Sequence, residues 1–162
     1  RGQHSVTIED LYQGAVPKLL LVCLVNASGF DGQIDRNPFY FQHYGATSAA
    51  FYVDGDSVPS PPLSTNFKRN SLTFTNAYDN LFQAVNQYRC DFGNGLTQEA
   101  FMGGSTIFSF KVHGSHDTDL RKGHTQLTLQ FNERLPHSVT MITYALFPSV
   151  LEINAQRDFR ER

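Results

Sequence analysis

Histidine and aspartate gather in one short stretch of this chain, which makes it the first candidate for metal chemistry. The residues are His113, His116, Asp117, Asp119 and His124. Imidazole and carboxylate groups are ligands for divalent transition metals, and β-sandwich enzymes of the cupin kind carry paired histidines on such scaffolds. The spacing matches no strong metal-binding signature, however, and Gly and Ser lie between the ligands. We therefore favour a solvated loop over a cupin-like metal site.

Nucleophilic catalysis finds less support in the sequence. The Gly-x-Ser-x-Gly turn that exposes a catalytic serine is absent. His43 stands among aromatic residues, where we expect a hydrogen-bonded core or interface histidine rather than a general base. The triplet Asp91-Phe92-Gly93 resembles a kinase motif in letters alone and is interpreted as part of a turn. The sequence thus offers no convincing active site, and we expect neither an enzyme nor a cofactor.

Charge and cysteine content exclude further classes. The formal net charge of the 162 residues is −2, which argues against a surface built to neutralise nucleic-acid phosphates. Arg157, Arg160 and Arg162 are interrupted by acidic residues and are expected to form a frayed polar tail. Cys23 and Cys90 are too few for a disulfide scaffold, so we expect reduced thiols and an intracellular compartment. No apolar run is long enough to predict a membrane span.

The elements that would position any site are mostly strands. Fourteen Phe and seven Tyr are distributed between frequent Gly and Pro residues, a profile typical of an all-β domain. Alternating or continuous apolar patterns predict strands, which lie at 5–11, 18–25, 39–44, 49–53, 72–74, 107–112, 127–131, 139–147 and 150–153. The continuous run from Lys18 to Val25 predicts a central strand covered on both faces.

One stretch, Asn37 to Pro62, carries more rings than a single core face requires. Two aromatic strands are predicted there, and an Asp54-Gly55 turn follows the second of them. The prolines after Val58 are expected to end the hairpin, because proline has no N–H to donate to a strand ladder. Bulky side chains on both faces of such strands indicate a second cover, from this chain or from another subunit. The contact candidates are Tyr40, Tyr44, Tyr52 and Tyr144, with packing inside the subunit as the alternative.

A single substantial helix is predicted from Asn76 to Tyr88, with Asn76 as its N-cap. Thr97 to Phe101 is expected to add one helical turn, closed by Gly103-Gly104. The fold prediction is therefore all-β: an eight-stranded jelly-roll, or Greek-key, sandwich with one inserted helix, occupying residues 1–162 as one domain. Because the chain begins at Arg1, we expect a fragment of a longer protein.

Several motifs in a fixed order give the chain a family resemblance. They are NPFYFQHY at 37–44, YVDG at 52–55 followed by VPS and PL, GNGLTQEAF at 93–101, and YALFPSVLEI at 144–153. With them, residues 8–157 resemble the C-terminal part of the major capsid (hexon) protein of Polinton/Maverick elements and adintoviruses. That family is about twice as long as this chain, so the resemblance covers its second jelly roll.

The resemblance implies a structural protein of the virion capsid, assembled inside the host cell. It implies a homotrimer that contacts neighbouring capsomers, the N-terminal jelly roll of the same protein, and a penton or minor capsid protein. The family carries no catalytic residues, so none are transferred. The alternative is a lectin-like jelly-roll module that binds a glycan or host receptor through loop aromatics such as Phe30, Phe67 and Tyr88.

Overall fold

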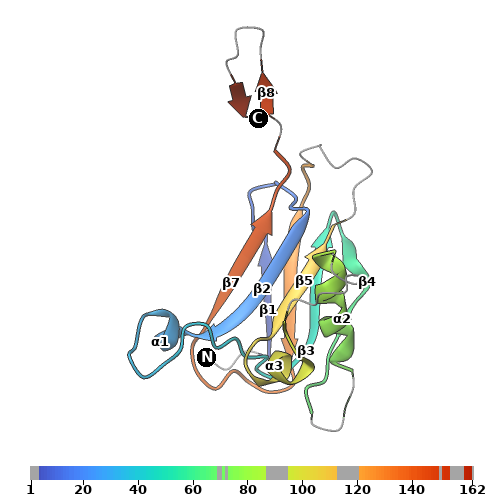
Figure 1. The fold of residues 1–162 in the computed structure, drawn as a ribbon. Coiled ribbons are helices and arrows are strands. Elements are labelled where there is room, and N and C mark those ends of the chain that lie inside the picture. Colours follow the sequence, from blue (N-terminus) through green and yellow to red (C-terminus); the bar gives the residue numbers. More distant parts are fainter. Residues whose placement is uncertain are drawn as a thin grey trace.

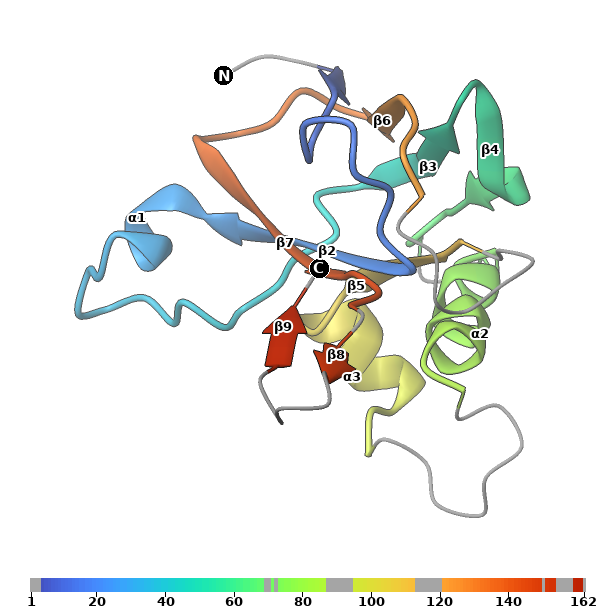
Figure 2. The same cartoon turned by 90° about the horizontal axis from the view of Figure 1, so that it is seen from above.

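The chain folds as a sandwich of two antiparallel β-sheets (Figures 1 and 2). The computed structural model describes residues 4–68, 71, 73–86, 95–112, 121–149, 151–153 and 159–161. One sheet has the strand order β1-β6-β3-β4 and the other the order β5-β2-β7. The prediction of an all-β sandwich is confirmed at this level.

Seven strands build the sandwich, and two more form a separate hairpin. The sandwich strands are β1 (Ser5–Glu9), β2 (Leu19–Asn26), β3 (Ala46–Val53), β4 (Asp56–Ser64), β5 (Ile107–Lys111), β6 (Thr125–Phe131) and β7 (Val139–Leu146). The helices are α1 (Ala27–Phe30), α2 (Thr75–Ala84) and α3 (Gln98–Gly103). β8 (Leu151–Ile153) pairs with β9 (Phe159–Glu161) outside both sheets, where a last edge strand and a frayed tail were expected.

The pairings between the sheets' strands are nested along the chain. β3 pairs with β4, β2 with β5, and β1 with β6. Starting from the β3–β4 hairpin, each further pair therefore joins the preceding strand of the chain to the next strand after it. β6 also pairs with β3, and β2 with β7, which assembles these pairs into two sheets. All of these pairs are antiparallel. The later strands thus pair with the earlier ones in reverse order along the chain.

The core lies between the sheets and follows from alternation along the strands. In β6, Leu127, Leu129 and Phe131 are buried while the residues between them are half-buried or exposed. The rings of Phe51 and Phe110 meet across the sheets with their centroids 6.0 Å apart. β2 lies between β5 and β7, so the prediction of a central strand at Lys18 to Val25 is confirmed.

α2 and α3 cover one part of the outer face of the three-stranded sheet, over β5 (Figure 2). The amide of Asn80 donates to the backbone carbonyl of Ser109, which is fully buried on that face. Under the helices the ring of Phe101 contacts those of Tyr78 and Phe67, with centroids 5.6 and 6.3 Å away. These helices leave the β7 side of the same face uncovered.

The prediction of a strand at Phe39 to Tyr44 is wrong. The segment is irregular and makes a single bridge, from Phe41 to Ser105. The side chain of Asn37 accepts the backbone N–H of Phe39 at 2.9 Å, which closes an Asx turn where a strand would start. Tyr44 has a φ of 47°, which ends any extended run. Local turn chemistry therefore outweighs the aromatic pattern.

The prediction that the prolines after Val58 end the hairpin is also wrong. β4 continues through Pro59, Pro61 and Pro62 to Ser64, because it is an edge strand that can leave N–H groups out of the ladder. The register shifts from Phe51↔Val58 to Ala49↔Leu63, so the prolines occupy a wide bulge. The predicted Asp54-Gly55 turn does join β3 to β4, with both residues at positive φ as a tight hairpin turn requires.

The predicted helix is shorter and starts earlier than expected. α2 begins at Thr75, and the residue before it, Phe74, is helical and buried rather than part of a strand. Asn76 lies inside the helix and does not cap it, while Leu72 and Tyr88 lie outside the described residues. The second helical turn was predicted well: Thr97 caps α3 by accepting from Ala100 N–H at 3.1 Å, and Gly104 ends it at a φ of 147°.

His43 gives the stability of this fold a pH dependence. Its ring stacks on Phe67 with centroids 4.1 Å apart, and its Nδ1 accepts the N–H of Gly45 at 2.8 Å. Burial lowers the pKa of His43 below its usual value of 6.5. Below that value the unfolded chain takes up a proton that the folded chain does not yet bind, so the free energy of unfolding falls as the pH falls.

We predict that His43→Asn flattens this dependence, since the asparagine amide does not titrate and its oxygen can still accept from Gly45. The measurement is the urea midpoint at about pH 7.5 and about pH 5.5 in both proteins. The parent should lose more stability on acidification than the variant. Equal losses would show that His43 is not a source of the acid sensitivity.

Candidate interaction surface

Exposed apolar side chains are concentrated in two segments of the described chain. Six large hydrophobic residues are exposed there, and none of them belongs to the four-stranded sheet or to the helices α2 and α3. They are Phe30 (53% exposed), Ile34 (105%), Phe39 (74%), Tyr40 (46%), Tyr144 (59%) and Leu146 (47%). The first four lie in and after α1, and the last two lie on β7. We call these six residues the apolar edge.

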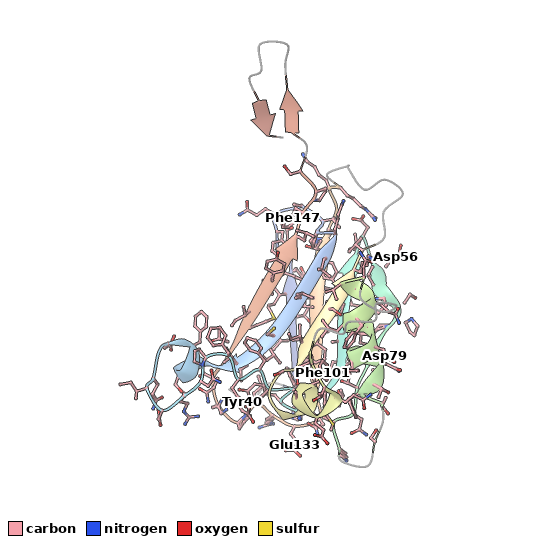
Figure 3. The ribbon with its side chains drawn as sticks, in the orientation of Figure 1. Tyr40, Asp56, Asp79, Phe101, Glu133 and Phe147 are labelled. Carbon is pink, nitrogen blue, oxygen red and sulfur yellow. The ribbon has the colours of Figure 1, made fainter. Side chains whose placement is uncertain are left out.

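The two segments adjoin each other at the start of β7. α1 follows directly from β2, and its first residue, Ala27, donates its N–H to the carbonyl of Ser138 at 3.1 Å. From there the segment after α1 projects sideways past β7 (Figure 1). Tyr40 and Phe147, the residue after β7, lie toward opposite ends of the sandwich (Figure 3). Of the apolar edge, Tyr40 thus lies toward one end of the sandwich, and Leu146, the residue before Phe147, lies toward the other.

Partly buried apolar residues of β2 and β7 continue the apolar edge across the sheet. Paired residues of antiparallel strands point to the same face. Leu21 pairs with Tyr144 and Cys23 with Ile142, and all but the exposed Tyr144 are half-buried. Burial raises the pKa of the Cys23 thiol to about 11, so it remains protonated at neutral pH. This face is apolar but remains partly exposed to solvent in the described structure.

β7 itself is an unusual edge strand. Its eight residues, VTMITYAL, contain no charge and no proline, and among the described strands it pairs with β2 alone. Protein edge strands are normally protected by prolines, bulges, charges or a covering element. β4 has its proline bulge, β5 lies under α2, and the short β1 carries Glu9. None of these devices protects β7 in the described structure.

The four tyrosines expected to make contacts lie in different places. Tyr144 and Tyr40 belong to the apolar edge, and the ring of Tyr40 also lies against Gly104. Tyr44 packs against the core. Its hydroxyl is buried without a hydrogen-bond partner among the described residues, and burial raises its pKa. Tyr52 is on β3, in the other sheet, where it pairs with Gln126. The structure thus exposes Tyr40 and Tyr144, whereas Tyr44 packs against the core and Tyr52 lies in the other sheet.

Three members of the apolar edge were not singled out from the sequence: Ile34, Phe39 and Leu146. Phe30 was named there as a loop aromatic for glycan or receptor binding, but not as a subunit contact. Phe30 and Ile34 lie within the turn-rich stretch NASGFDGQID, where an isolated apolar residue has no strand or helix face to join. That isolation is the signal that would have indicated them. Phe39 was hidden by the wrong strand assignment, and Leu146 by the expectation that both faces of its strand are covered.

The predicted metal loop lies mostly outside the described residues, which include His124 but not His113, His116, Asp117 or Asp119. The backbone N–H of His124 donates to the carboxylate of Asp54 at 2.8 Å. This bond, together with Arg121 at 3.2 Å, lowers the pKa of Asp54 and ties the β3–β4 turn to the start of β6. Within the described ranges, no three His, Cys, Asp or Glu side chains gather as metal ligands do.

A groove of about 740 Å³ opens on the opposite side, between β4 and α2. Its lining combines small apolar residues with amides, hydroxyls and two cations, and includes Ser57, Ser60, Gln83, Lys111 and Arg121. The carboxylate of Asp56 also lines it, and no aromatic ring is among its described lining residues. Of the aromatics considered for sugar binding, Phe30 is exposed far from this groove, Phe67 packs in the core, and Tyr88 is outside the described residues.

No helix among the described residues is both long enough and apolar enough to span a bilayer.

Comparison with known proteins yields one similar sequence of interest. The chain is 26% identical over 165 aligned residues to an uncharacterized protein of Caenorhabditis elegans, F54H12.2. The match covers 97% of this chain but 39% of the nematode protein, so the chain spans about two fifths of its relative's length. No family model matches the chain, and no solved structure matches it.

Proposed function

We propose that this chain is the jelly-roll domain of a double jelly-roll major capsid protein, of the hexon-like kind found in Polinton/Maverick elements and adintoviruses. In this proposal the domain acts by self-association, as part of trimeric capsomers of a virion assembled inside the host cell. It uses no cofactor and catalyses no reaction. Its partners are copies of itself, the N-terminal jelly roll of the same protein, and a penton or minor capsid protein.

The nested strand pairing supports the jelly-roll part of the proposal. A jelly roll is a long antiparallel hairpin rolled into two facing sheets, and its Greek-key connections follow from that rolling. The pairs β3–β4, β2–β5 and β1–β6 have the corresponding order, and the two sheets separate them as a jelly roll requires. α2 and α3 are inserted between β4 and β5, at one connection of the roll.

The apolar edge is the observation that carries the self-association part. Soluble monomers rarely expose large contiguous apolar surface, and such surface marks sites of protein contact. Six large hydrophobic side chains are exposed in the described structure, and four of them lie in α1 and the segment that follows it. Aromatic residues such as Phe39 and Tyr144 are enriched at the centres of protein interfaces. A capsid subunit needs such a face on a rigid scaffold.

The proposal is tested by expressing the complete protein that contains this chain and imaging it by negative-stain electron microscopy. We expect three-fold symmetric particles of pseudo-hexagonal outline, or closed shells built from them. Uniform particles of single-subunit size at micromolar concentration would contradict the capsid proposal.

A second candidate, a lectin-like module for a glycan or host receptor, is favoured by the groove between β4 and α2. Amide and hydroxyl side chains such as Gln83, Ser57 and Ser60 suit sugar hydroxyls. The groove lacks the aromatic ring on which sugars commonly stack, so we place this candidate second. A glycan array with no ligand retained would remove it, whereas binding that Gln83→Ala abolishes would establish it.

A further inference from the structure

We propose that the open edge of β7 is filled by an additional strand, which the same polypeptide supplies from residues directly upstream of β1. This inference goes beyond the proposed function, because it rests on strand topology and does not require a capsid. The nested series pairs β3 with β4, then β2 with β5, then β1 with β6. Its next step pairs β7 with the strand that precedes β1.

The numbers of strands in the two sheets also indicate a missing strand beside β7. The sheet with β1 has four strands and the sheet with β7 has three, in the order β5-β2-β7. One additional strand beside β7 would complete two facing four-stranded sheets, as in an eight-stranded jelly roll. β8, where the sequence predicted a last edge strand, pairs with β9 outside both sheets and does not fill this position.

The backbone of β7 directs N–H and C=O groups to its outer edge, where an additional strand could pair with them. Ala27 and Ser138 are hydrogen-bonded partners, continuing the register in which Asn26 pairs with Val139. Hydrogen-bonded and non-bonded pairs alternate in antiparallel ladders, so the even-numbered residues of β7 direct their N–H and C=O groups to β2. The odd-numbered residues direct theirs outward, to an edge that no described strand occupies. They are Val139, Met141, Thr143 and Ala145.

The direction of the proposed strand, and the short connection it needs to reach β1, are both compatible with a segment upstream of β1. A strand antiparallel to β7 would end beside Val139. β1 begins at Ser5, which pairs with Gln130 near the end of β6, and the chain passes from there to β7 through residues 132–138. The start of β1 and the start of β7 are therefore at the same end of the sandwich. A short connection across that end joins the additional strand to β1.

A strand of the same polypeptide explains the edge better than a second copy does. The connection makes the pairing intramolecular, which gives it a high effective concentration. Most of the C. elegans relative lies outside its match to this chain, so a longer polypeptide has residues to contribute. The segment after α1, which projects past the start of β7, also narrows the space for a second sandwich approaching edge-on.

The test is site-resolved amide hydrogen exchange in the complete protein. In the unmodified protein we expect Met141, Thr143 and Ala145 to be protected by at least about 100-fold, as amides in a paired ladder are. Replacing the ten or so residues before Arg1 by a Gly/Ser segment of equal length should remove that protection. Ile142 and Tyr144, which bond to β2, are the internal control and should stay protected.

Two other results would contradict the proposal. Unprotected odd-numbered amides in the unmodified protein would show an open edge, and this result needs no variant. Odd-numbered amides that stay protected in the Gly/Ser protein would show another occupant, and protection that falls on dilution would identify it as a second copy. Should the Gly/Ser protein lose the even-numbered protection as well, a shuffled upstream segment of identical composition replaces it. Absence of capsomers with the exchange pattern intact would overturn the proposed function alone.

Discussion

Tyr144→Asp, introduced into the complete protein, is expected to weaken self-association by about 30-fold or more. Tyr144 is 59% exposed on β7, where it pairs with Leu21 on the part of the sheet face that α2 and α3 leave uncovered. Aromatic residues at interface centres typically contribute about 2 kcal/mol or more, and an aspartate there would also place an unpaired carboxylate in an apolar contact. The dissociation constant, measured by sedimentation equilibrium, reports the change.

Two matched variants separate the loss of the Tyr144 ring at the interface from the loss of its hydroxyl and from the effect of an added charge. Tyr144→Phe keeps the ring and should leave self-association within about 3-fold of the parent, since it removes a hydroxyl alone. Thr7→Asp adds the same charge at an exposed position of β1, away from the apolar edge, and should also have little effect. If Tyr144→Asp assembles as the parent does, the apolar edge is not the contact surface.

Phe101→Ala is expected to destabilise the fold by about 3–5 kcal/mol, a large share of the stability of a domain this size. Phe101 is fully buried on α3, where its ring contacts those of Phe67 and Tyr78. Truncation would leave a cavity beneath both α3 and α2 (Figure 3). The measurement is the free energy of unfolding from urea titration.

Phe39→Ala is the control for that variant because it removes the same side chain from an exposed position. Phe39 is 74% exposed, so its truncation should change the free energy of unfolding by no more than about 0.5 kcal/mol. Similar losses in both variants would mean that the aromatic cluster under α3 is not the main support of the helices.

Strands with strong patterns were predictable from the sequence, because alternation reports burial directly. Leu127, Leu129 and Phe131 form the buried row of β6, and the apolar run around Leu20 is the central β2. The Asp54-Gly55 turn and the short helix ended by Gly104 were also predictable, since each depends on local chemistry. These features need no knowledge of distant contacts.

The errors arose where tertiary context decides. An aromatic run after Asn37 looks like a strand, but an Asx turn and packing against Gly104 and Leu24 hold it in an irregular path. Prolines look like strand terminators, but an edge position tolerates Pro59 and Pro61 in a bulge. Sequence alone does not say which strand lies at an edge.

The candidate surface was predictable only in part for the same reason. An excess of rings pointed to a contact face and to Tyr40 and Tyr144, which are exposed on the apolar edge. Tyr44 was indistinguishable from them in sequence but packs against the core. The open edge of β7 depends on which strands are neighbours, and this information is absent from the local pattern.

Sedimentation velocity of the complete, unmodified protein is the most direct test of self-association. At micromolar concentration we expect a trimer or larger assemblies, with no more than a minor monomer fraction. A single monomeric species that persists across the accessible concentration range would contradict the account.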